Sequence, residues 1–450
     1  MPTDAIARYH DLLASGTVAA DSQAALDDQQ DLRGLHFGTR PLCSVLRPRF
    51  LTLPQYRFLQ RSVETLLPAF DTVYRKALAD EGFRRQFRLL DWESDLLVID
   101  PGFACPYPTA RFDSFYVSDD ELKFTEFNSE TPAGAGYSDA LTQVYHGLPA
   151  FRAFTRHYHA FPLPCMPGVT HALLDAFAQW QGTRTEKPRV AILDWREVPT
   201  FSEFVLFFDE FRSLGLEVRI VDPRDLEYTD GKLMCGDYHI NLIYKRVLIT
   251  ELIERGGIDH PVVRAVRDGK VCMANTFRCK ILFKKASFAV VSDERNANLF
   301  SQTQLHAIVT QIPWTRVVEE RKTVIDGGAI DLVPFVVKNK DRLVLKPNDD
   351  YGGKGIVLGW TVDQSAWETA VQTALAEPFV VQQKIRLPSE PYPSFDGGVL
   401  RVVDRMLDTN PYVAFGTTVH GCLTRISTDE LVNVTAGGGS TVPTFLLEAR

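Results

Sequence analysis

The sequence carries one conspicuous glycine-rich turn flanked by lysines. It reads LVLKPNDDYGGKGIV over residues 343–357, with an apolar run ending at Lys346 and a turn made of Gly352, Gly353, Lys354 and Gly355. Glycines let the backbone approach a ligand closely and direct several N–H groups at one point, which suits a phosphate. The spacing fits neither the GxxxxGK[ST] loop nor the GxGxxG fingerprint. It favours a flap over nucleotide phosphates, and an ordinary hairpin turn is the alternative.

A second group of functional side chains falls on a predicted β-hairpin over residues 111–128. Arg111 and Asp113 are two residues apart, as are Glu126 and Asn128, so each pair shares one face of its strand. If the two faces coincide, two carboxylates, an amide oxygen and a guanidinium converge. These oxygen ligands suit Mg²⁺, and the arginine can hold a phosphate oxygen. The alternative is the solvated face of an edge hairpin.

A weaker signal follows the apolar run that starts at Phe379. Its end could offer backbone groups to an adenine beside an apolar slot, although a plain core strand is the simpler interpretation; the residues concerned are Gln382, Gln383, Lys384 and Ile385. Two more glycine-rich segments lie at 128–136 and 433–440, and the sequence assigns no role to the loop Gly437–Gly439.

Composition and missing motifs exclude several classes of protein. Hydrophobic residues make up 45% and charged residues 24%, which is typical of a globular chain. The net charge of −8 argues against a dedicated nucleic-acid binder. No GxSxG, HExxH or CxxC motif occurs, so neither a nucleophile elbow nor a zinc site is expected. The seven cysteines are expected to be buried free thiols. Neither a signal peptide nor a membrane span is expected, so the predicted location is cytoplasmic.

The hydrophobic periodicity predicts a mixed α/β (α+β) protein in four parts. Residues 1–100 are mostly helical, residues 101–180 carry the hairpin, and a polar linker ends at Pro188. Residues 188–270 follow a strand–helix–strand order, which indicates a parallel α/β unit. Residues 271–450 alternate between strands and a helix that Asp363 is expected to cap. A short strand is also predicted at Leu96–Ile99.

Taken together, the motifs resemble the ATP-grasp superfamily in its circularly permuted form, which includes glutathionylspermidine synthetase. The hairpin precedes the Lys346 strand by more than 200 residues, whereas ordinary ATP-grasp proteins have the reverse order. The matching segments also include Glu130–Gly134, Tyr244–Arg246 and Phe283–Ser287. The resemblance implies a permuted ATP-grasp fold with a helical N-terminal region. It makes 101–180 the metal-ligand half, 188–270 an α/β pre-ATP-grasp-like domain on the substrate side, and 271–450 the nucleotide-binding part.

The resemblance also implies a role for each candidate residue. Asp113, Glu126 and Asn128 match Mg²⁺ ligands, and Arg111 matches the group that stabilises the transferred phosphoryl. Lys346 together with either Lys284 or Lys285 matches the pair of lysines that contact ATP. The phosphate flap and the adenine hinge correspond to residues 352–355 and 382–385.

The implied activity is an ATP-dependent carboxylate–amine ligase that works through an acyl phosphate, with ATP and Mg²⁺ as cofactors. Its partners would be a small carboxylate and a small amine, and neither nucleic acid nor membrane. Arg246 is a candidate anchor for a substrate carboxylate. No cysteine amidase domain and no glutathione- or polyamine-binding set can be matched, so the substrates stay open. One alternative is an ATP-binding regulatory or partner-binding module without ligase chemistry, and a more remote one is a phosphotransferase on a small acid.

Overall fold

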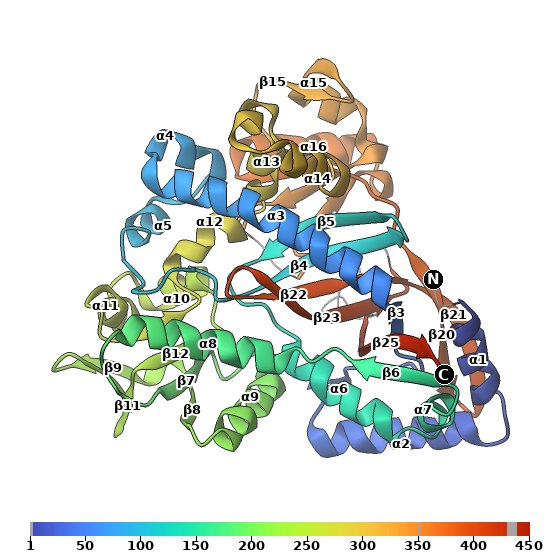
Figure 1. Ribbon diagram of the computed structural model, residues 1–450. Helices are drawn as coiled ribbons and strands as arrows, with labels where there is room; N and C mark the ends of the chain where they lie inside the picture. The colour runs from blue at the N-terminus through green and yellow to red at the C-terminus, as the bar shows by residue number, and fades with distance from the viewer. Residues whose placement is uncertain (1–2, 350–351, 430–438) are drawn as a thin grey trace.

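A central antiparallel sheet joins two segments that lie far apart in the sequence. In the computed structural model, which describes residues 3–349, 352–429 and 439–450, three lobes surround this sheet (Figure 1). Its strand order is β20-β21-β23-β22-β4-β5, and β24 pairs with β23. The first segment gives β4 (Thr109–Ser118) and β5 (Glu121–Asn128). The second gives β20 (Ser389–Asp396), β21 (Val399–Leu407), β22 (Asn410–Ala414), β23 (Thr418–Ser427) and β24 (Ser440–Val442).

One long helix, α3 (Leu53–Ala79), crosses the central sheet (Figure 1). It starts at a capping box in which Thr52 and Gln55 bond each other's backbone, a strong signal for a helix start. Its buried face contacts the hairpin: the Phe70 ring lies 5.4 Å from both Phe112 and Phe127. The strand predicted at residues 96–99 is wrong, because Leu96 ends the helix α5 (Asp91–Leu96) and a turn follows. A shorter helix, α4 (Glu81–Arg84), lies between α3 and α5.

The α/β lobe is built on a parallel sheet, as the strand–helix–strand pattern predicts. Its order is β13-β12-β7-β8, with β7 (Arg189–Leu193), β8 (Glu217–Val221), β12 (Leu242–Lys245) and β13 (Cys272–Ala274). Its helices are α8 (Met166–Gln181), α9 (Phe201–Ser213), α10 (Ile249–Gly256) and α11 (Pro261–Arg267), and a small sheet is formed by β9 (Leu226–Thr229), β10 (Lys232–Cys235) and β11 (Tyr238–Ile240). Because the strands are parallel, the residues after β7, β12 and β13 meet at one edge, where α/β sheets bind ligands.

Asn275, which follows β13, attaches the α/β lobe to the base of the hairpin. Its side-chain nitrogen donates to the carbonyl oxygens of Thr109 and Ser129, each at 2.7 Å. It is buried, so these bonds also satisfy an amide that would otherwise lose its water. The sheet edge of the α/β lobe is therefore held against the hairpin.

The third sheet forms the lobe at the top of Figure 1. Its order is β14-β19-β17-β18, with β14 (Thr315–Val317), β17 (Leu343–Pro347), β18 (Val357–Leu358) and β19 (Phe379–Gln383). As predicted, Asp363 caps α16 (Gln364–Ala376) by accepting the backbone N–H of Ala366 at 2.8 Å. The lobe also contains α13 (Ala286–Ser292), α14 (Gln302–Gln311), α15 (Leu332–Lys338), β15 (Lys322–Ile325) and β16 (Gly328–Asp331). The short helix α12 (Lys280–Phe283) lies below α3, beside the hairpin (Figure 1).

The remaining lobe brings the first and last described segments together. β3 (Arg49–Thr52) pairs in parallel with β25 (Thr444–Ala449), which also pairs with β6 (Tyr158–Pro162). Around this sheet lie α1 (Thr3–Leu13), α2 (Val18–Arg33), α6 (Ala135–Gly147), α7 (Pro149–Phe154) and the small hairpin β1 (His36–Phe37) with β2 (Arg40–Pro41). The segment 1–100 thus contributes to this lobe and to the cover of the central sheet, and the segment 271–450 contributes to both the top lobe and the central sheet.

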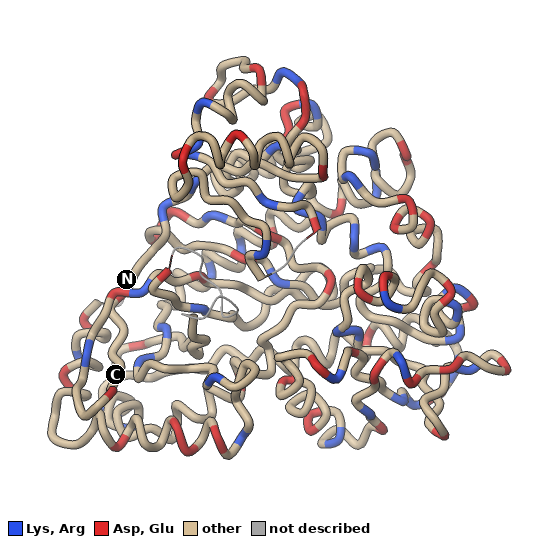
Figure 2. Tube along the Cα trace, turned by 180° about the vertical axis from the view of Figure 1, so that it is seen from behind, with Lys and Arg blue, Asp and Glu red and all other residues tan. Residues whose placement is uncertain are grey.

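Charges of both signs are mixed over the surface. Seen from behind, Lys and Arg positions are interspersed with Asp and Glu positions along the trace (Figure 2). Within the described ranges, no helix is long and apolar enough to cross a bilayer. All seven cysteines are free, as expected, and five of them are buried.

The core of the top lobe gives a test of its packing. Trp367 is fully buried and its indole N–H donates to the Val336 carbonyl oxygen at 3.0 Å. We expect Trp367→Ala to destabilise the lobe by about 3–5 kcal/mol, because a large cavity replaces the ring. Urea unfolding followed by circular dichroism measures this change. Val309→Ala, at a side chain that is 77% exposed, is the control and should leave stability within about 0.5 kcal/mol of the wild type. A similar small change for both variants would contradict the packing described.

Candidate functional site

The two faces of the hairpin coincide. In the register of β4 and β5, Arg111 lies opposite Asn128 and Asp113 lies opposite Glu126. All four residues line one cavity of about 390 Å³. Two carboxylates, an amide and a guanidinium therefore stand on alternate rungs of one ladder, with the Phe112–Phe127 pair between them, and line the same cavity.

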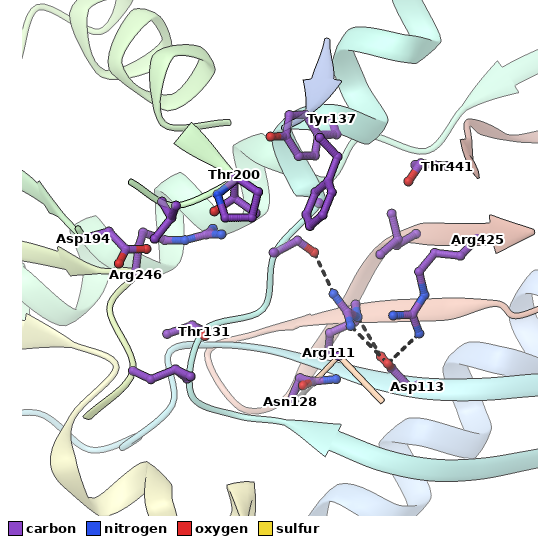
Figure 3. A pocket seen from close by; sticks show the side chains of 18 of the residues that line it. Arg111, Asp113, Asn128, Thr131, Tyr137, Asp194, Thr200, Arg246, Arg425 and Thr441 are labelled. Carbon is purple, nitrogen blue, oxygen red and sulfur yellow. Dashed lines mark hydrogen bonds and ion pairs between the residues drawn. The ribbon is translucent and has the colours of Figure 1, made fainter. Parts of the chain in front are cut away.

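A chain of alternating charges runs through this wall of the cavity. Arg111 binds Asp113 bidentately, with Nε–Oδ1 and Nη2–Oδ2 distances of 2.7 and 3.1 Å. On the other side, Arg425 of β23 donates from Nη2 to Asp113 Oδ2 at 2.7 Å and from Nε to Asp408 Oδ2 at 2.6 Å. Figure 3 shows Arg111 and Arg425 on either side of Asp113. The arginines are thus held by a carboxylate of β4 and by Asp408, which lies between β21 and β22.

The pKa values of Asp113 and Asp408 are shifted in opposite directions. Burial opposes ionisation of Asp113, but the two arginines outweigh it and hold its pKa well below the usual range. Burial raises the pKa of Asp408, and Arg425 only partly offsets this rise. Asp113 is therefore a permanent anion, as a ligand for a divalent cation must be.

The lysines at 284 and 285, which the sequence cannot separate, point to different surroundings. α12 ends at Phe283, and Lys284 adopts extended backbone angles (φ −55°, ψ 130°). Lys285 Nζ lies 3.2 Å from Glu126 Oε1 on the hairpin. Lys284 Nζ instead lies 2.7 Å from Glu93 and 3.0 Å from Asp349. Of the two lysines, Lys285 therefore faces the carboxylates that line the cavity.

Lys346 reaches the same place from the top lobe. Its ammonium donates to Gln382 Oε1 at 2.7 Å. Loss of water around the amine lowers the pKa of Lys346 to about 8; Glu126 and Asp113 oppose this change, and Lys285 adds to it. Lys346 thus lies within electrostatic reach of Lys285 and the hairpin carboxylates, which come from separate segments, although neither lysine is among the residues that line the cavity.

Lys284 belongs to a buried ionic cluster of three lysines and three carboxylates. Lys280 Nζ lies 2.5 Å from Asp349 and 3.4 Å from both Glu93 and Glu130. Lys245 Nζ lies 3.5 Å from Glu130. Burial opposes the charge on Lys280, but the carboxylates outweigh it and raise its pKa. We call this set the six-charge cluster; its members are Lys245, Lys280, Lys284, Glu93, Glu130 and Asp349.

The glycine-rich turn, residues 352–355, comes shortly after Asp349, the last member of the six-charge cluster along the chain. Asp349 is tied to Lys280 and Lys284, and the loop follows directly after residues 350–351, which lie outside the described residues. Gly352, Gly353 and Gly355 have φ values of 65°, 78° and 68°, which side chains disfavour. Gly352 lines the 390 Å³ cavity, whereas Lys354 is exposed. Of the unassigned loop at 437–439, residues 437 and 438 also lie outside the described ranges.

The predicted adenine hinge is not among the residues that line this cavity. Gln382 is buried and bonds Lys346 and Thr315, which fits a structural part of β19. Gln383, Lys384 and Ile385 line a second cavity of about 640 Å³. The Lys384 ammonium lies 3.8 Å from the centre of the Trp360 ring.

The cavity continues from the hairpin to the carboxyl edge of the α/β sheet. There it is lined by Asp194, which follows β7, Arg246, which follows β12, and Glu251 of α10. Arg246 is not an isolated cation: it donates from Nη2 to Glu203 at 2.9 Å and from Nη1 to the Tyr244 hydroxyl at 2.9 Å. The structure places this candidate carboxylate anchor in the wall of the cavity.

The hairpin donors fit a magnesium ion by their chemistry. Mg²⁺ takes one or two carboxylates and completes its octahedron with water and substrate phosphates. Asp113, Glu126 and Asn128 supply such a set. Within the described ranges, no cluster of three or more His, Cys, Asp or Glu side chains could hold a metal ion unaided. The arrangement therefore suits a metal that arrives with phosphates.

Several cavity residues carried no recognisable signal in the sequence. Arg425 lies 312 positions from Asp113, and both Arg425 and its partner Asp408 gain their role through strand pairing alone. Asp194 could have been found, because it ends the predicted strand 190–194 of a parallel sheet, where such sheets bind ligands.

The comparisons with known proteins identify the family. Residues 99–427 match the family described as circularly permuted ATP-grasp type 2. The chain belongs to this family. The predicted fold class is thus confirmed, including the permuted order that puts the hairpin before the lysine strand.

Two curated relatives and one solved structure are similar to this ATP-grasp protein. It is 25% identical over 237 residues to a putative glutamate–cysteine ligase of Frankia casuarinae, covering 50% of this chain and 25% of the relative. It is 26% identical over 241 residues to one of Frankia alni, covering 51% and 26%. The chain therefore spans about a quarter of the length of these relatives. A glutathione synthetase-like effector of Globodera pallida, in its apo form, aligns with a TM-score of 0.60 at 12% identity, covering 95% of this chain and 96% of the effector, which shows a shared fold.

Replacing each of the adjacent lysines by methionine tests their different surroundings. We expect Lys284→Met to lower the free energy of unfolding by about 3–5 kcal/mol, because Glu93 and Asp349 lose a buried counterion. We expect Lys285→Met to cost less stability, because its partner Glu126 is partly exposed, but to weaken ATP binding at least 10-fold. Thermal unfolding and calorimetric ATP titration measure the two effects. If Lys285→Met lowered stability and Lys284→Met weakened ATP binding instead, the described placement of the two lysines would be contradicted.

Proposed function

We propose that this protein is an ATP-dependent carbon–nitrogen ligase that joins a small carboxylate to a small amine. The observation that carries the proposal is the placement of two lysines near the hairpin carboxylates: Lys285 Nζ lies 3.2 Å from Glu126, and Glu126 and Asp113 act electrostatically on Lys346. This arrangement surrounds a nucleotide's phosphates with cations and offers carboxylates to the accompanying metal. Family membership and the names of the curated relatives support the same class.

The chemistry requires activation of the acid. A carboxylate does not condense with an amine in water, because its oxygen is a poor leaving group. Transfer of the γ-phosphoryl of ATP to the carboxylate gives an acyl phosphate, which the amine then attacks. In phosphoryl transfer, the rate enhancement comes from positioning of the reactants and stabilisation of charge, so no protein nucleophile is needed. The absence of nucleophile motifs from the sequence agrees with this mechanism.

Each residue of the proposed site has a distinct task in this mechanism. Asp113, Glu126 and Asn128 would hold Mg²⁺, which neutralises phosphate charge when bound. Arg111, fixed by Asp113, presents its guanidinium to the transferred phosphoryl, where charge develops. Lys285 and Lys346 bind the phosphates from the opposite side, and the 352–355 turn covers them and excludes water.

The curated names also suggest a finer assignment. The carboxylate substrate would be an amino acid, as in the glutamate–cysteine ligases to which the chain is similar. The likeness to glutathionylspermidine synthetase concerns the motifs and reaction class, and the present cavity supports no choice of glutathione or a polyamine.

ADP release with a panel of amino acids and amines tests the reaction class. We expect Lys346→Met and Arg111→Met each to lower the rate at least 100-fold, because each removes a cation that stabilises the transferring phosphoryl. Lys338→Met is the matched control, since Lys338 is an exposed lysine of α15 in the same lobe as Lys346. Unchanged turnover in both site variants, or binding of ATP without any turnover on the panel, would reject the ligase in favour of a binding module.

A second test concerns the metal. We expect EDTA to abolish ADP release and added Mg²⁺ to restore it. Glu126→Gln should raise the Mg²⁺ concentration for half-maximal rate about 10- to 100-fold, because a neutral amide replaces a charged ligand. Glu121→Gln, at the exposed start of the same strand, is the control. An identical Mg²⁺ dependence in both variants would place the metal elsewhere.

A further inference from the structure

The two ends of the cavity are lined by different sets of charges. At the hairpin end, Arg111 and Arg425 are matched by the carboxylates of Asp113 and Glu126. At the far end stand the carboxylates of Asp194 and Glu251, with Arg246 beside them. Figure 3 shows Asp194 and Arg246 well apart from Arg111 and Asp113, with Thr131 between them.

Asp194 is buried but keeps one oxygen for a ligand. It is 8% exposed, and its Oδ1 accepts the backbone N–H of Trp195 at 2.8 Å. In the described part of the chain, its Oδ2 has no hydrogen-bond partner, although the side chain lines the cavity. Asp194 Oδ2 is not among the described buried side-chain oxygens that lack a partner, so it is open to the cavity. It can therefore accept a hydrogen bond from a ligand bound there.

Glu251 adds a second negative charge at the same place. Its Oε2 accepts the indole N–H of Trp195 at 3.2 Å, so one tryptophan orients both acids. Burial raises the pKa of Asp194 to about 6, although the Trp195 N–H, Arg246 and Lys245 lower it, and Glu251 adds to the rise. Both carboxylates line the cavity beside Trp195, where they can attract the same cation.

Arg246 does not pair with Asp194. Its guanidinium pairs with Glu203, which is fully buried, and among the described residues the ion pairs of Arg246 within 4.0 Å do not include Asp194. Glu203 Oε1 is also fixed by the backbone N–H groups of Gly134 and Gly136, at 2.7 and 3.1 Å. The Arg246 guanidinium therefore bonds Glu203 and makes no hydrogen bond to Asp194, on which it acts only as a more distant positive charge.

We propose that Asp194, with Glu251 beside it, binds a protonated amine of a substrate, a group that recognises the substrate and does not react. This inference rests on the proposed ligase function and extends it to the substrate class. The attacking amine must be uncharged and must lie at the hairpin end, beside Arg111. An ammonium held at the far end therefore belongs to a second functional group, either the α-ammonium of an amino-acid carboxylate or the second nitrogen of a diamine.

Calorimetric titration with two matched pairs of probes tests the site and distinguishes these sources. L-glutamate is compared with glutarate, which lacks the ammonium, and 1,4-diaminobutane is compared with 1,4-butanediol. We expect one amino probe to bind at least 10-fold more tightly than its neutral analogue, as charge-assisted hydrogen bonds require. Discrimination within the first pair assigns the amino acid, and within the second pair the diamine.

The variants Asp194→Asn and Glu251→Gln should each reduce this discrimination about 10-fold or more. Asp194→Asn keeps a side-chain oxygen that can accept the Trp195 N–H, and Glu251→Gln carries the test if the first variant does not fold. Asp237→Asn is the matched control, because Asp237 is an exposed carboxylate of the same lobe. Equal binding within both pairs, absence of binding by both amino probes, or wild-type discrimination in both variants would overturn the inference.

The outcome is separable from that of the ligase proposal. Titration needs no turnover, so a protein that releases ADP but ignores the ammonium would overturn this inference alone. A protein that discriminates the probes but never hydrolyses or transfers the γ-phosphoryl would overturn the ligase proposal alone.

Discussion

The six-charge cluster is the constraint on which the arrangement of the lobes depends. Its members come from α5, the segment after β5, β12, α12 with the residue that follows it, and Asp349 after β17. Five of the six charges are buried and Asp349 is half-buried, so removing them from water is expensive, and their mutual attraction offsets this cost only in one geometry. Any shift of a lobe would leave a charge unpaired in a dry interior. The cluster therefore contributes more to the specificity of the arrangement than to net stability.

This constraint fixes the wall of the cavity indirectly. Because Lys284 is held by Glu93 and Asp349, the next residue along the chain faces Glu126. Asp349 is held by the same contacts, and Gly352, three residues further on, lines the cavity. The cluster thus lies next to two parts of the proposed phosphate site, Lys285 and the glycine-rich turn.

Local patterns predicted most of the elements that carry the site. Alternation over residues 111–128 gave the hairpin, and its faces coincide because the register pairs Asp113 with Glu126. Asp363 predicted the start of α16 to the residue. The roles of Arg425 and Asp408 could not be predicted, because they depend on pairing of β22 and β23 with a strand from another part of the chain. The sequence could not show which of Lys284 and Lys285 faces the cavity carboxylates, because this depends on the backbone angles after α12.

The central sheet has a consequence for biosynthesis. β4 and β5 emerge from the ribosome early, but the neighbour of β4 in the sheet is β22, which begins at Asn410. Until then, one edge of the hairpin presents unpaired backbone groups, a state that invites pairing with other chains. The α/β lobe can complete its parallel sheet well before that point, because its strands end at Ala274. Nascent chains should therefore carry a finished α/β lobe beside an unfinished central sheet for much of translation, and this interval is when a chaperone would be needed.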